Sequence, residues 1–333
     1  MEIDGYIKRF MPVWKEWRLD KFLGSGSYGN VWQVINDKNE TAAIKEVIVP
    51  PAGAGTIEMA CLQGLDLGNA RLYFEDTLKK TIEEADMQCS LSDCNNIVHF
   101  IDYKIKSLEN PDEFGWAFYI LMDKVQAFPE YLMQNGITVS DLIHLGIDLC
   151  NALERCRKSG IVHRDIKLEN IFYCRQKNCF QLGDFGIAHY CERPTATKGR
   201  PGTLTHMSPE VYCGMTFSYK DDLYAIGMIL YKLMNYNRIP LLPDYPYQYT
   251  PAQRNDAMMC RLKGAELPLP AITKLKPEQI SEANKIRAGI RLDINDLEKI
   301  QMLGSIAHKA ISADKNKRYG SAEELREALQ KLK

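Results

Sequence analysis

The stretch His163-Arg164-Asp165-Ile166-Lys167-Leu168-Glu169-Asn170, with Asp184-Phe185-Gly186 downstream, decides the fold of this 333-residue chain. The carboxylate of Asp165 can accept a proton from a hydroxyl group. Asn170 and Asp184 offer oxygen atoms, the ligands that Mg²⁺ prefers. Three side chains from one region of the sequence can therefore take part in one reaction, and we take them as the candidate site.

The spacing of these residues is specific. H-R-D is followed by a Lys two positions after the Asp, an Asn five positions after it, and D-F-G downstream. This combination is the catalytic signature of protein kinases. The sequence therefore resembles a eukaryotic-like (Hanks-type) protein kinase catalytic domain. The resemblance implies an α+β, two-lobed fold, in which a small antiparallel β-sheet lobe carries one main helix and the larger lobe is mainly helical.

The resemblance also divides the chain into regions. Residues 1–16 are expected to form an N-terminal extension that packs on the first lobe, residues 17–124 the N-lobe and residues 125–333 the C-lobe. A run rich in Pro and Gly breaks the strand pattern and indicates an insertion over about residues 50–70. This insertion and the sequence Leu-Gly-Asp-Phe-Gly look more like bacterial serine/threonine kinases than animal ones.

A glycine-rich turn, Gly24-Ser25-Gly26-Ser27-Tyr28-Gly29-Asn30-Val31, is predicted between two strands. Glycines let backbone N–H groups approach phosphate oxygens. The same G-x-G-x-x-G pattern opens Rossmann folds, but a helix follows it there, whereas β-type residues follow it here. By resemblance, Gly24, Gly26 and Gly29 cover the phosphates of ATP, and Val31 and Ala43 line the nucleotide site.

Lys45 ends the sequence Ala42-Ala43-Ile44-Lys45, which is similar to the V-A-I-K strand of kinases. By that match it binds the α- and β-phosphates and needs a Glu partner from the following helix, expected from about Leu72 to Leu91. Glu83 and Glu84 are adjacent and point about 100° apart, so only one can face inward. We choose Glu84, because Met87 and Leu91 then share its face.

The sequence Tyr119-Ile120-Leu121-Met122-Asp123-Lys124-Val125 resembles the last N-lobe strand and the hinge. This match places Met122 at the back of the adenine pocket. It also implies that the backbone of Asp123 and Val125 bonds the edge of the adenine. Backbone contacts do not depend on the side chain, so the sequence cannot test them.

The C-lobe is predicted to open with a short helix near Phe128 to Asn135, followed by a long helix from about Val139 to Lys158 with Ser140 as its N-cap. By resemblance, Asp222 anchors the backbone of the catalytic loop. The same match predicts that Glu210 and Arg318 form a buried ion pair. All three residues have structural roles.

The activation segment is expected over residues 187–210, closing with Ser208-Pro209-Glu210 where the family usually has A-P-E. Thr203 belongs to the substrate platform by motif match. Kinases with an Arg before the catalytic Asp, here Arg164, are commonly activated by a phosphate on this segment. We therefore expect autophosphorylation in trans, in a transient homodimer, at Thr195 or Thr197. The alternative is that both are solvated loop residues.

The implied reaction transfers the γ-phosphoryl group of ATP to Ser or Thr hydroxyls of protein substrates. The catalytic set is Asp165, Lys167, Asn170 and Lys45, with Mg²⁺, or alternatively Mn²⁺, bound by Asn170 and Asp184. A Lys two positions after the catalytic Asp marks Ser/Thr specificity in this family. Two other readings stay open: a pseudokinase that binds nucleotide as a scaffold, and a small-molecule kinase of related fold.

Composition and charge limit the binding partners and the location that we expect for the protein. The formal net charge of −1 gives no indication of a general nucleic-acid or anionic-membrane binder. The longest apolar run, Leu223 to Tyr231, is too short to span a bilayer. We therefore expect a cytoplasmic protein, or one at the cytoplasmic face of a membrane if the natural chain continues beyond Lys333.

Overall fold

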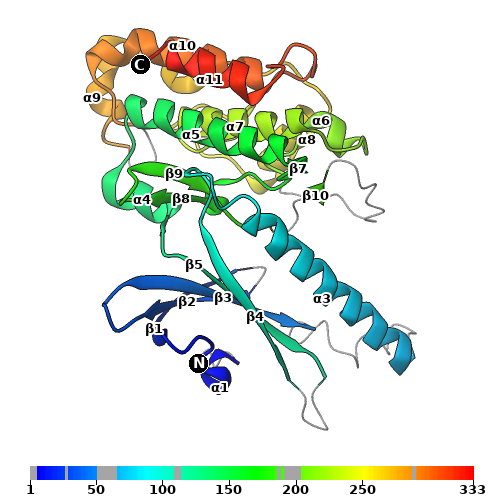
Figure 1. Ribbon diagram of the computed structural model, residues 1–333. Helices are drawn as coiled ribbons and strands as arrows, with labels where there is room; N and C mark the ends of the chain where they lie inside the picture. The colour runs from blue at the N-terminus through cyan, green and yellow to red at the C-terminus, as the bar shows by residue number, and fades with distance from the viewer. Residues whose placement is uncertain are drawn as a thin grey trace. The chain divides into compact units, whose positions relative to one another are not determined.

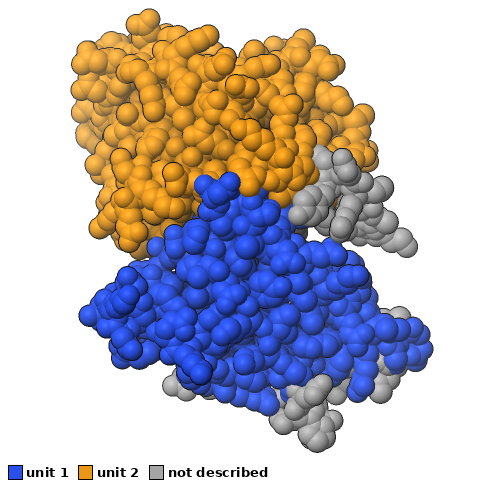
Figure 2. Space-filling view, viewed as in Figure 1, with its two compact units in different colours: residues 1–93, 98–124 blue, residues 94–97, 125–333 orange. Residues whose placement is uncertain are grey.

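The chain forms two compact units in the computed structural model, which describes residues 6–26, 29–50, 66–108, 114–185, 189–190, 204–286 and 290–333. One unit contains residues 1–93 and 98–124, and the other contains residues 94–97 and 125–333 (Figure 2). The first is built on an antiparallel sheet and the second mainly on helices (Figure 1), which is the predicted two-lobed α+β fold. Within the described ranges, no helix combines the length and the apolar character needed to cross a membrane.

A five-stranded antiparallel sheet forms the centre of the first unit, with strand order β1-β2-β3-β5-β4. Its strands are β1 (Arg18–Gly26), β2 (Gly29–Ile35), β3 (Thr41–Val49), β4 (Phe100–Ser107) and β5 (Trp116–Asp123). The middle strands β3 and β5 are rich in β-branched and aromatic residues, which suit a pleated surface that is covered by other elements.

Helix α3 (Leu67–Cys89) packs on one face of this sheet, where its Ala85 joins a cluster with Phe118 and Ile120. The predicted bounds of about Leu72 to Leu91 were wrong at both ends. The helix begins earlier because Asp66 caps it, its side chain accepting the N–H of Asn69 at 2.9 Å.

The other face of the sheet is covered by the N-terminal segment, residues 6–17, which includes the short helix α1 (Ile7–Phe10). Its buried residues Ile7, Val13 and Trp14 join one hydrophobic cluster with sheet residues, which are Trp32, Val34, Ala42, Ile44, Ala117, Tyr119 and Leu121. The Trp14 indole N–H donates to the Asp102 carboxylate at 2.7 Å. The extension therefore packs on the first unit, as the sequence predicts.

The second unit is assembled around the helices α5 (Val139–Lys158) and α7 (Tyr219–Leu233), which pack on each other. Nearly every residue of α7 is buried. The other helices are α4 (Phe128–Asn135), α6 (Pro209–Tyr212), α8 (Pro251–Leu262), α9 (Ile280–Ala283), α10 (Leu297–Ala310) and α11 (Ala322–Gln330), with short 3₁₀ turns at Leu168–Asn170, Ala271–Lys274, Pro277–Gln279 and Ile294–Asp296. In Figure 1, α10 and α11 lie beside α5 and α7.

The N-cap of α5 is Thr138 and not the predicted Ser140. The Thr138 side chain accepts the N–H of Asp141 at 3.1 Å, and the Asp141 carboxylate accepts the N–H of Thr138 at 2.9 Å. Because this reciprocal pair satisfies two helix-end groups, it outweighs the capping by a single Ser.

Two small sheets complete this unit: β6 (Gln126–Ala127), β8 (Ile171–Cys174) and β9 (Cys179–Leu182) form one, and β7 (Ile161–Val162) and β10 (His189–Tyr190) form the other. The catalytic stretch starts directly after β7, and the antiparallel hairpin β8–β9 carries the chain from Asn170 to Asp184. The hairpin therefore positions the two parts of the catalytic signature together.

Candidate active site

The loop between β7 and β8 is anchored by Asp222, near the start of α7. The Asp222 carboxylate accepts the backbone N–H of His163 at 2.8 Å and that of Arg164 at 2.9 Å. Arg164 has a φ of 70°, in the left-handed region that a non-glycine residue adopts only under tertiary constraint. Burial raises the pKa of Asp222 to about 7, and the two N–H donors act in the opposite sense. This is the anchoring arrangement expected for Asp222 from the sequence.

The side chain of Asp165 is held by two neighbours on the same loop. Lys167 Nζ lies 2.6 Å from Asp165 Oδ2. Asn170 Nδ2 donates to the Asp165 carbonyl oxygen at 2.8 Å and to Oδ2 at 3.2 Å. Asp165 and Asn170 are buried, and Lys167 is partly exposed. The loop thus brings together three of the predicted catalytic residues around one carboxylate.

The D-F-G stretch is joined to this loop through His163 and Asn170. The His163 Nε2 lies 3.2 Å from the Gly183 carbonyl, and its ring meets that of Phe185 edge-on with centroids 4.7 Å apart. Complete burial lowers the pKa of His163 to about 4, so the imidazole is neutral at pH 7. The Gly183 N–H donates to the Asn170 carbonyl at 2.9 Å. Asp184 follows with a φ of 58°, next to the residue that bonds Asn170.

The two predicted metal-binding residues fit a hard cation. Because Asn170 uses its amide nitrogen to bond Asp165, its side-chain oxygen is left as a donor atom for a cation, and Asp184 has a carboxylate that could serve in the same way. No group of three or more His, Cys, Asp or Glu side chains that could hold a metal occurs in the described part of the chain. Two oxygen donors suit Mg²⁺, which commonly takes its other ligands from phosphates and water.

The nucleotide-binding residues predicted from the sequence lie in the first unit, apart from Val125, which begins the main part of the second. Val31 on β2 pairs with Lys45 on β3, and Ala43 on β3 pairs with Met122 on β5. Gly26 pairs with Gly29 at the end of the β1–β2 hairpin. A Cβ on Gly29 would lie 1.9 Å from the Glu46 carbonyl oxygen, at a φ of 126°. This position therefore requires glycine for both space and backbone conformation.

Burial separates the two candidate partners of Lys45. Glu84 is half-buried on α3, whereas its neighbour Glu83 is exposed. Met87, at the i+3 position from Glu84, is buried. The burial pattern agrees with the choice of Glu84 as the inward-facing residue, and its pairing with Lys45 stays a prediction.

The hinge residues also keep their predicted roles as predictions. The Asp123 N–H already donates to the His99 carbonyl at 3.0 Å. Any bond from the Asp123 backbone to an adenine would therefore use its carbonyl oxygen. Met122 and Val125 are partly buried.

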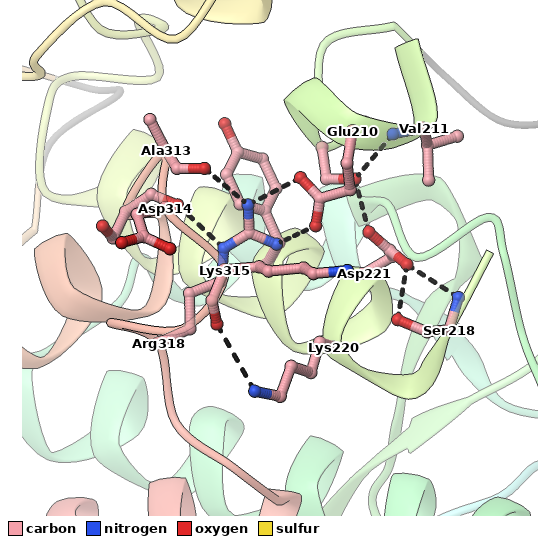
Figure 3. A network of polar contacts seen from close by, with 12 residues as sticks. Glu210, Val211, Ser218, Lys220, Asp221, Ala313, Asp314, Lys315 and Arg318 are labelled. Carbon is pink, nitrogen blue, oxygen red and sulfur yellow. Dashed lines mark hydrogen bonds and ion pairs between the residues drawn. The ribbon is translucent and has the colours of Figure 1, made fainter. Parts of the chain in front are cut away.

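Of the activation segment, the structure describes His189–Tyr190 and the residues from Leu204 onward; Gly186, Thr195, Thr197 and Thr203 lie outside the described residues. Its C-terminal end is fixed by the ion pair of Glu210 with Arg318, whose nitrogens Nη1 and Nη2 lie 2.6 and 2.8 Å from the two carboxylate oxygens (Figure 3). Arg318 also donates from Nε to the Ser312 carbonyl at 2.8 Å. This is the buried pair expected from the sequence.

Arg261 on α8 is a residue that sequence reasoning missed. It is fully buried and donates to the carbonyl oxygens of Met207 at 2.7 Å and Leu204 at 2.6 Å. It also donates to the Tyr224 hydroxyl at 2.7 Å. An Arg side chain is rarely buried, so its residue type gives no signal of burial; a clue was its position four residues after the apolar Ala257, on the same helix face.

Comparison with known proteins agrees with this geometry. Residues 17–329 match the protein kinase domain family. The chain belongs to the protein kinase family. It is 29% identical over 177 residues to a probable serine/threonine-protein kinase of Clostridium perfringens, covering 52% of this chain and 24% of that protein. It is 28% identical over 179 residues to the probable serine/threonine-protein kinase PknB of Lactococcus lactis, covering 52% and 26%.

A longer match relates this kinase to the mitogen-activated protein kinase kinase kinase 3 of Arabidopsis thaliana. The two are 26% identical over 285 residues, which are 78% of this chain and 40% of that protein. The chain therefore spans well under two thirds of the length of each of these three relatives. At these identities the match supports a protein kinase similar to serine/threonine kinases, including bacterial ones.

Proposed function

We propose that this kinase transfers the γ-phosphoryl group of ATP to Ser or Thr hydroxyls of protein substrates, with Mg²⁺ or Mn²⁺ as the metal. The observation that carries the proposal is the position of Asp165. Its carboxylate is held by Lys167 and Asn170 on a loop whose backbone is bonded to Asp222. A carboxylate oriented in this way can accept the proton of an acceptor hydroxyl.

Phosphoryl transfer passes through a loose transition state whose charge is spread over oxygen atoms, so catalysis depends on positioning and electrostatics. Asp165 orients the acceptor hydroxyl and takes its proton. The Lys167 ammonium, 2.6 Å from that carboxylate, offsets negative charge on the transferring group. Asn170 and Asp184 would hold the metal, which when bound neutralises charge on the phosphates.

In the first unit, the proposed nucleotide contacts come from the hairpin β1–β2 and from strands β3 and β5. Backbone N–H groups at Gly24, Gly26 and Gly29 would face the phosphates, and Lys45, held by Glu84, would bind them directly. The residues proposed to surround the adenine are Val31, Ala43, Met122, Asp123 and Val125. The register of β2, β3 and β5 supports this grouping, because it pairs Val31 with Lys45 and Ala43 with Met122.

The test is Asp165→Asn, which removes proton acceptance and keeps the shape of the side chain. We expect ATP affinity to stay within about twofold, whereas kcat falls by roughly 10²–10⁴-fold. The matched control is Asp37→Asn, because the Asp37 side chain is 95% exposed and distant in sequence from the site. Turnover of the Asp165→Asn variant at the wild-type rate would refute the role of Asp165.

The same assay separates the other two functions considered from the sequence. A pseudokinase would bind ATP without transferring phosphate to a generic protein substrate, and a small-molecule kinase would leave proteins unlabelled. Lys45, Asp165, Asn170 and Asp184 are all present, which favours an active enzyme. The Pro209-Glu210 closure of the activation segment, held by Arg318, favours a protein substrate, because that segment serves as its platform.

We also propose autophosphorylation in trans at Thr195 or Thr197, through a transient homodimer. The support is from the sequence: Arg164 precedes Asp165, and Arg193, Lys198 and Arg200 surround the two threonines. Mass spectrometry after incubation with Mg-ATP should find one of them modified, at a rate that rises with protein concentration. The double variant Thr195→Ala/Thr197→Ala should lose activity. Modification of neither residue, or full activity of the double variant, would refute this part.

A further inference from the structure

Basic side chains gather around the end of the activation segment, at residues 204–207. We call Lys167, Lys232, Arg254 and Arg261, with the imidazole of His206, the basic cluster. Lys232 lies near the C-terminal end of α7, and Arg254 and Arg261 lie on α8. All of these residues belong to the second unit. The mechanism above uses only Lys167, so the other members need a separate explanation.

His206 holds the ammonium group of Lys232. Its Nε2 lies 3.3 Å from Lys232 Nζ, and its Nδ1 lies 3.1 Å from Thr205 Oγ1. A protonated Lys can only donate, so Nε2 is the acceptor and the ring proton is on Nδ1. Burial, together with the charges of Lys232, Arg261 and Lys167, lowers the pKa of His206 well below its ordinary value. His206 is therefore a neutral residue that orients a cation.

Within the described part of the chain, Lys232 and Arg261 have no carboxylate partner, whereas Lys167 lies 2.6 Å from Asp165 Oδ2. Among the described residues, Lys232 forms no ion pair, and the bonds of Arg261 go to two carbonyl oxygens and one hydroxyl. Burial lowers the pKa of Lys232, and Arg254 and Arg261 lower it further, while the exposed Glu169 acts in the opposite sense. A partly buried cation without a carboxylate is costly, and an anion that reached it would remove that cost.

The cluster lies beside the proposed acceptor site. Lys167 contributes to the electrostatic environment of His206, and its ammonium is 2.6 Å from the Asp165 carboxylate. The backbone that Arg261 holds, at Leu204 and Met207, leads directly into Ser208-Pro209-Glu210. A peptide whose hydroxyl reached Asp165 would therefore bring its flanking residues close to Lys232. Lys232 itself is partly exposed.

We propose that Lys232, oriented by His206, binds an anionic side chain of the protein substrate next to the acceptor Ser or Thr. The kinase would accordingly select acidic sequences and disfavour basic ones. Arg254, exposed on α8, adds positive charge to the same subsite. This inference rests on the proposed function, because it specifies the substrate class of that reaction. The anion is a carboxylate or a phosphate group, since both match an ammonium donor.

The experiment measures kcat/KM for a set of serine peptides that differ at one flanking position. Each of the three residues on either side of the serine is in turn Ala, Asp, phosphoserine or Lys. At the best position, we expect the wild type to prefer Asp over Lys by roughly tenfold or more, about 1.4 kcal/mol. Raising the ionic strength should reduce this ratio, because an exposed charge contact is screened. A greater gain from phosphoserine than from Asp would identify phosphate as the ligand.

Lys232→Glu is the decisive variant, and it should invert the preference so that Lys peptides become the better substrates. Its kcat/KM for the all-Ala peptide should stay within about threefold of wild type, because only the flanking contact changes. His206→Phe, which removes the acceptor for Lys232 Nζ, should weaken the preference for Asp without inverting it. The control is Lys331→Glu, an exposed residue after α11, which should change nothing.

Two results would overturn the proposal while leaving the proposed function intact. One is a wild-type enzyme that phosphorylates Asp and Lys peptides equally well. The other is a Lys232→Glu variant with an unchanged Asp/Lys ratio, even if its melting temperature falls, because a purely structural Lys232 would behave in that way. Fluorescence anisotropy measures the affinities of the Asp and Lys peptides, and so compares the two peptides without requiring turnover. A wild type that phosphorylates no peptide would refute the proposed function, and the binding ratio would still decide whether Lys232 selects anions.

Discussion

Replacing Arg318 by Met removes one charge of a buried pair and keeps most of the volume of the side chain. The Arg318 side chain is fully buried, and that of Glu210 is only 11% exposed. The guanidinium donates to both carboxylate oxygens of Glu210 (Figure 3). It also donates to the carbonyl oxygen of Ser312 and lies over the Tyr224 ring, 4.7 Å from its centroid. The Met variant cannot make any of these polar contacts.

The expected loss of stability follows from the charge that is left behind. Removing one partner of a buried ion pair costs about 3–5 kcal/mol, because the remaining carboxylate is desolvated and unpaired. For a chain of this size, that corresponds to a fall in melting temperature of roughly 4–7 °C. Glu210→Gln in the Arg318→Met background should recover part of the loss, since the amide carries no charge.

The pH dependence gives a sharper test of this explanation. Burial raises the pKa of Glu210, but the hydrogen bonds and charge of Arg318 outweigh it, so that the pKa is lower than its ordinary value. A carboxyl group whose pKa is lower in the folded chain than in the unfolded chain stabilises the fold at pH values above its unfolded pKa. This stabilisation is lost as the pH falls through the folded pKa. Without Arg318, Glu210 takes up a proton more readily. The difference between wild type and variant should therefore shrink from pH 7 towards pH 4.

Scanning fluorimetry at pH 7, 5 and 4 measures both effects. If Arg318→Met melts within about 1 °C of wild type at pH 7, the pair contributes little and the reasoning is refuted. A large loss that is equal at all three pH values would instead assign the effect to packing and to the carbonyl contacts of Arg318.

Two further predictions concern the glycine loop and a buried histidine. Gly29→Ala should lower the melting temperature, because its Cβ would lie 1.9 Å from the Glu46 carbonyl oxygen. A Cβ on Gly24 would have no atom of the described residues within 4 Å, so Gly24→Ala should keep the stability of the protein and weaken ATP binding. Equal melting temperatures for the two variants would contradict this prediction. The pKa of His163 is about 4 when folded and about 6.5 in an unfolded chain, so acid favours unfolding by up to about 1.4 kcal/mol per pH unit across that window. Urea unfolding at pH 6.5 and 4.5 should show that the free energy of unfolding falls less between these pH values for His163→Tyr than for wild type. Equal losses of free energy in the two proteins would contradict this prediction.

The parts of the site that could be predicted from the sequence are those with fixed local spacing. Asp165, Lys167 and Asn170 are close because they share one short loop, so their spacing alone indicated the cluster. The resemblance to kinases implied an Asp that anchors the loop, and Asp222 was chosen over the neighbouring Asp221 because it opens the apolar run. The structure shows why they differ: Asp221 accepts the N–H and hydroxyl of Ser218, while Asp222 bonds the catalytic loop (Figure 3 shows Asp221).

The basic cluster could not be predicted in the same way. His206 and Lys232 meet across 26 positions, and Arg261 meets Leu204 across 57. Neither pair belongs to a motif with fixed spacing, so the contact arises only when α7 and α8 are packed. The start of α3 and the N-cap of α5 were misplaced for a related reason: the Asp66 and Thr138 side chains both accept backbone N–H groups, and several residues nearby had similar capping propensity.

The N-terminal segment packs as part of the first unit, although it lies outside the region that matches the kinase family. The family match begins at residue 17, whereas the hydrophobic cluster on the second face of the sheet begins at Ile7. Lys45 and Glu46 are successive residues of β3 and point to opposite faces. On the face covered by residues 6–17, Glu46 accepts the Tyr119 hydroxyl at 3.3 Å. A fragment cut at residue 17 would therefore expose Trp32 and Ile44 as an apolar surface directly behind the strand that carries Lys45.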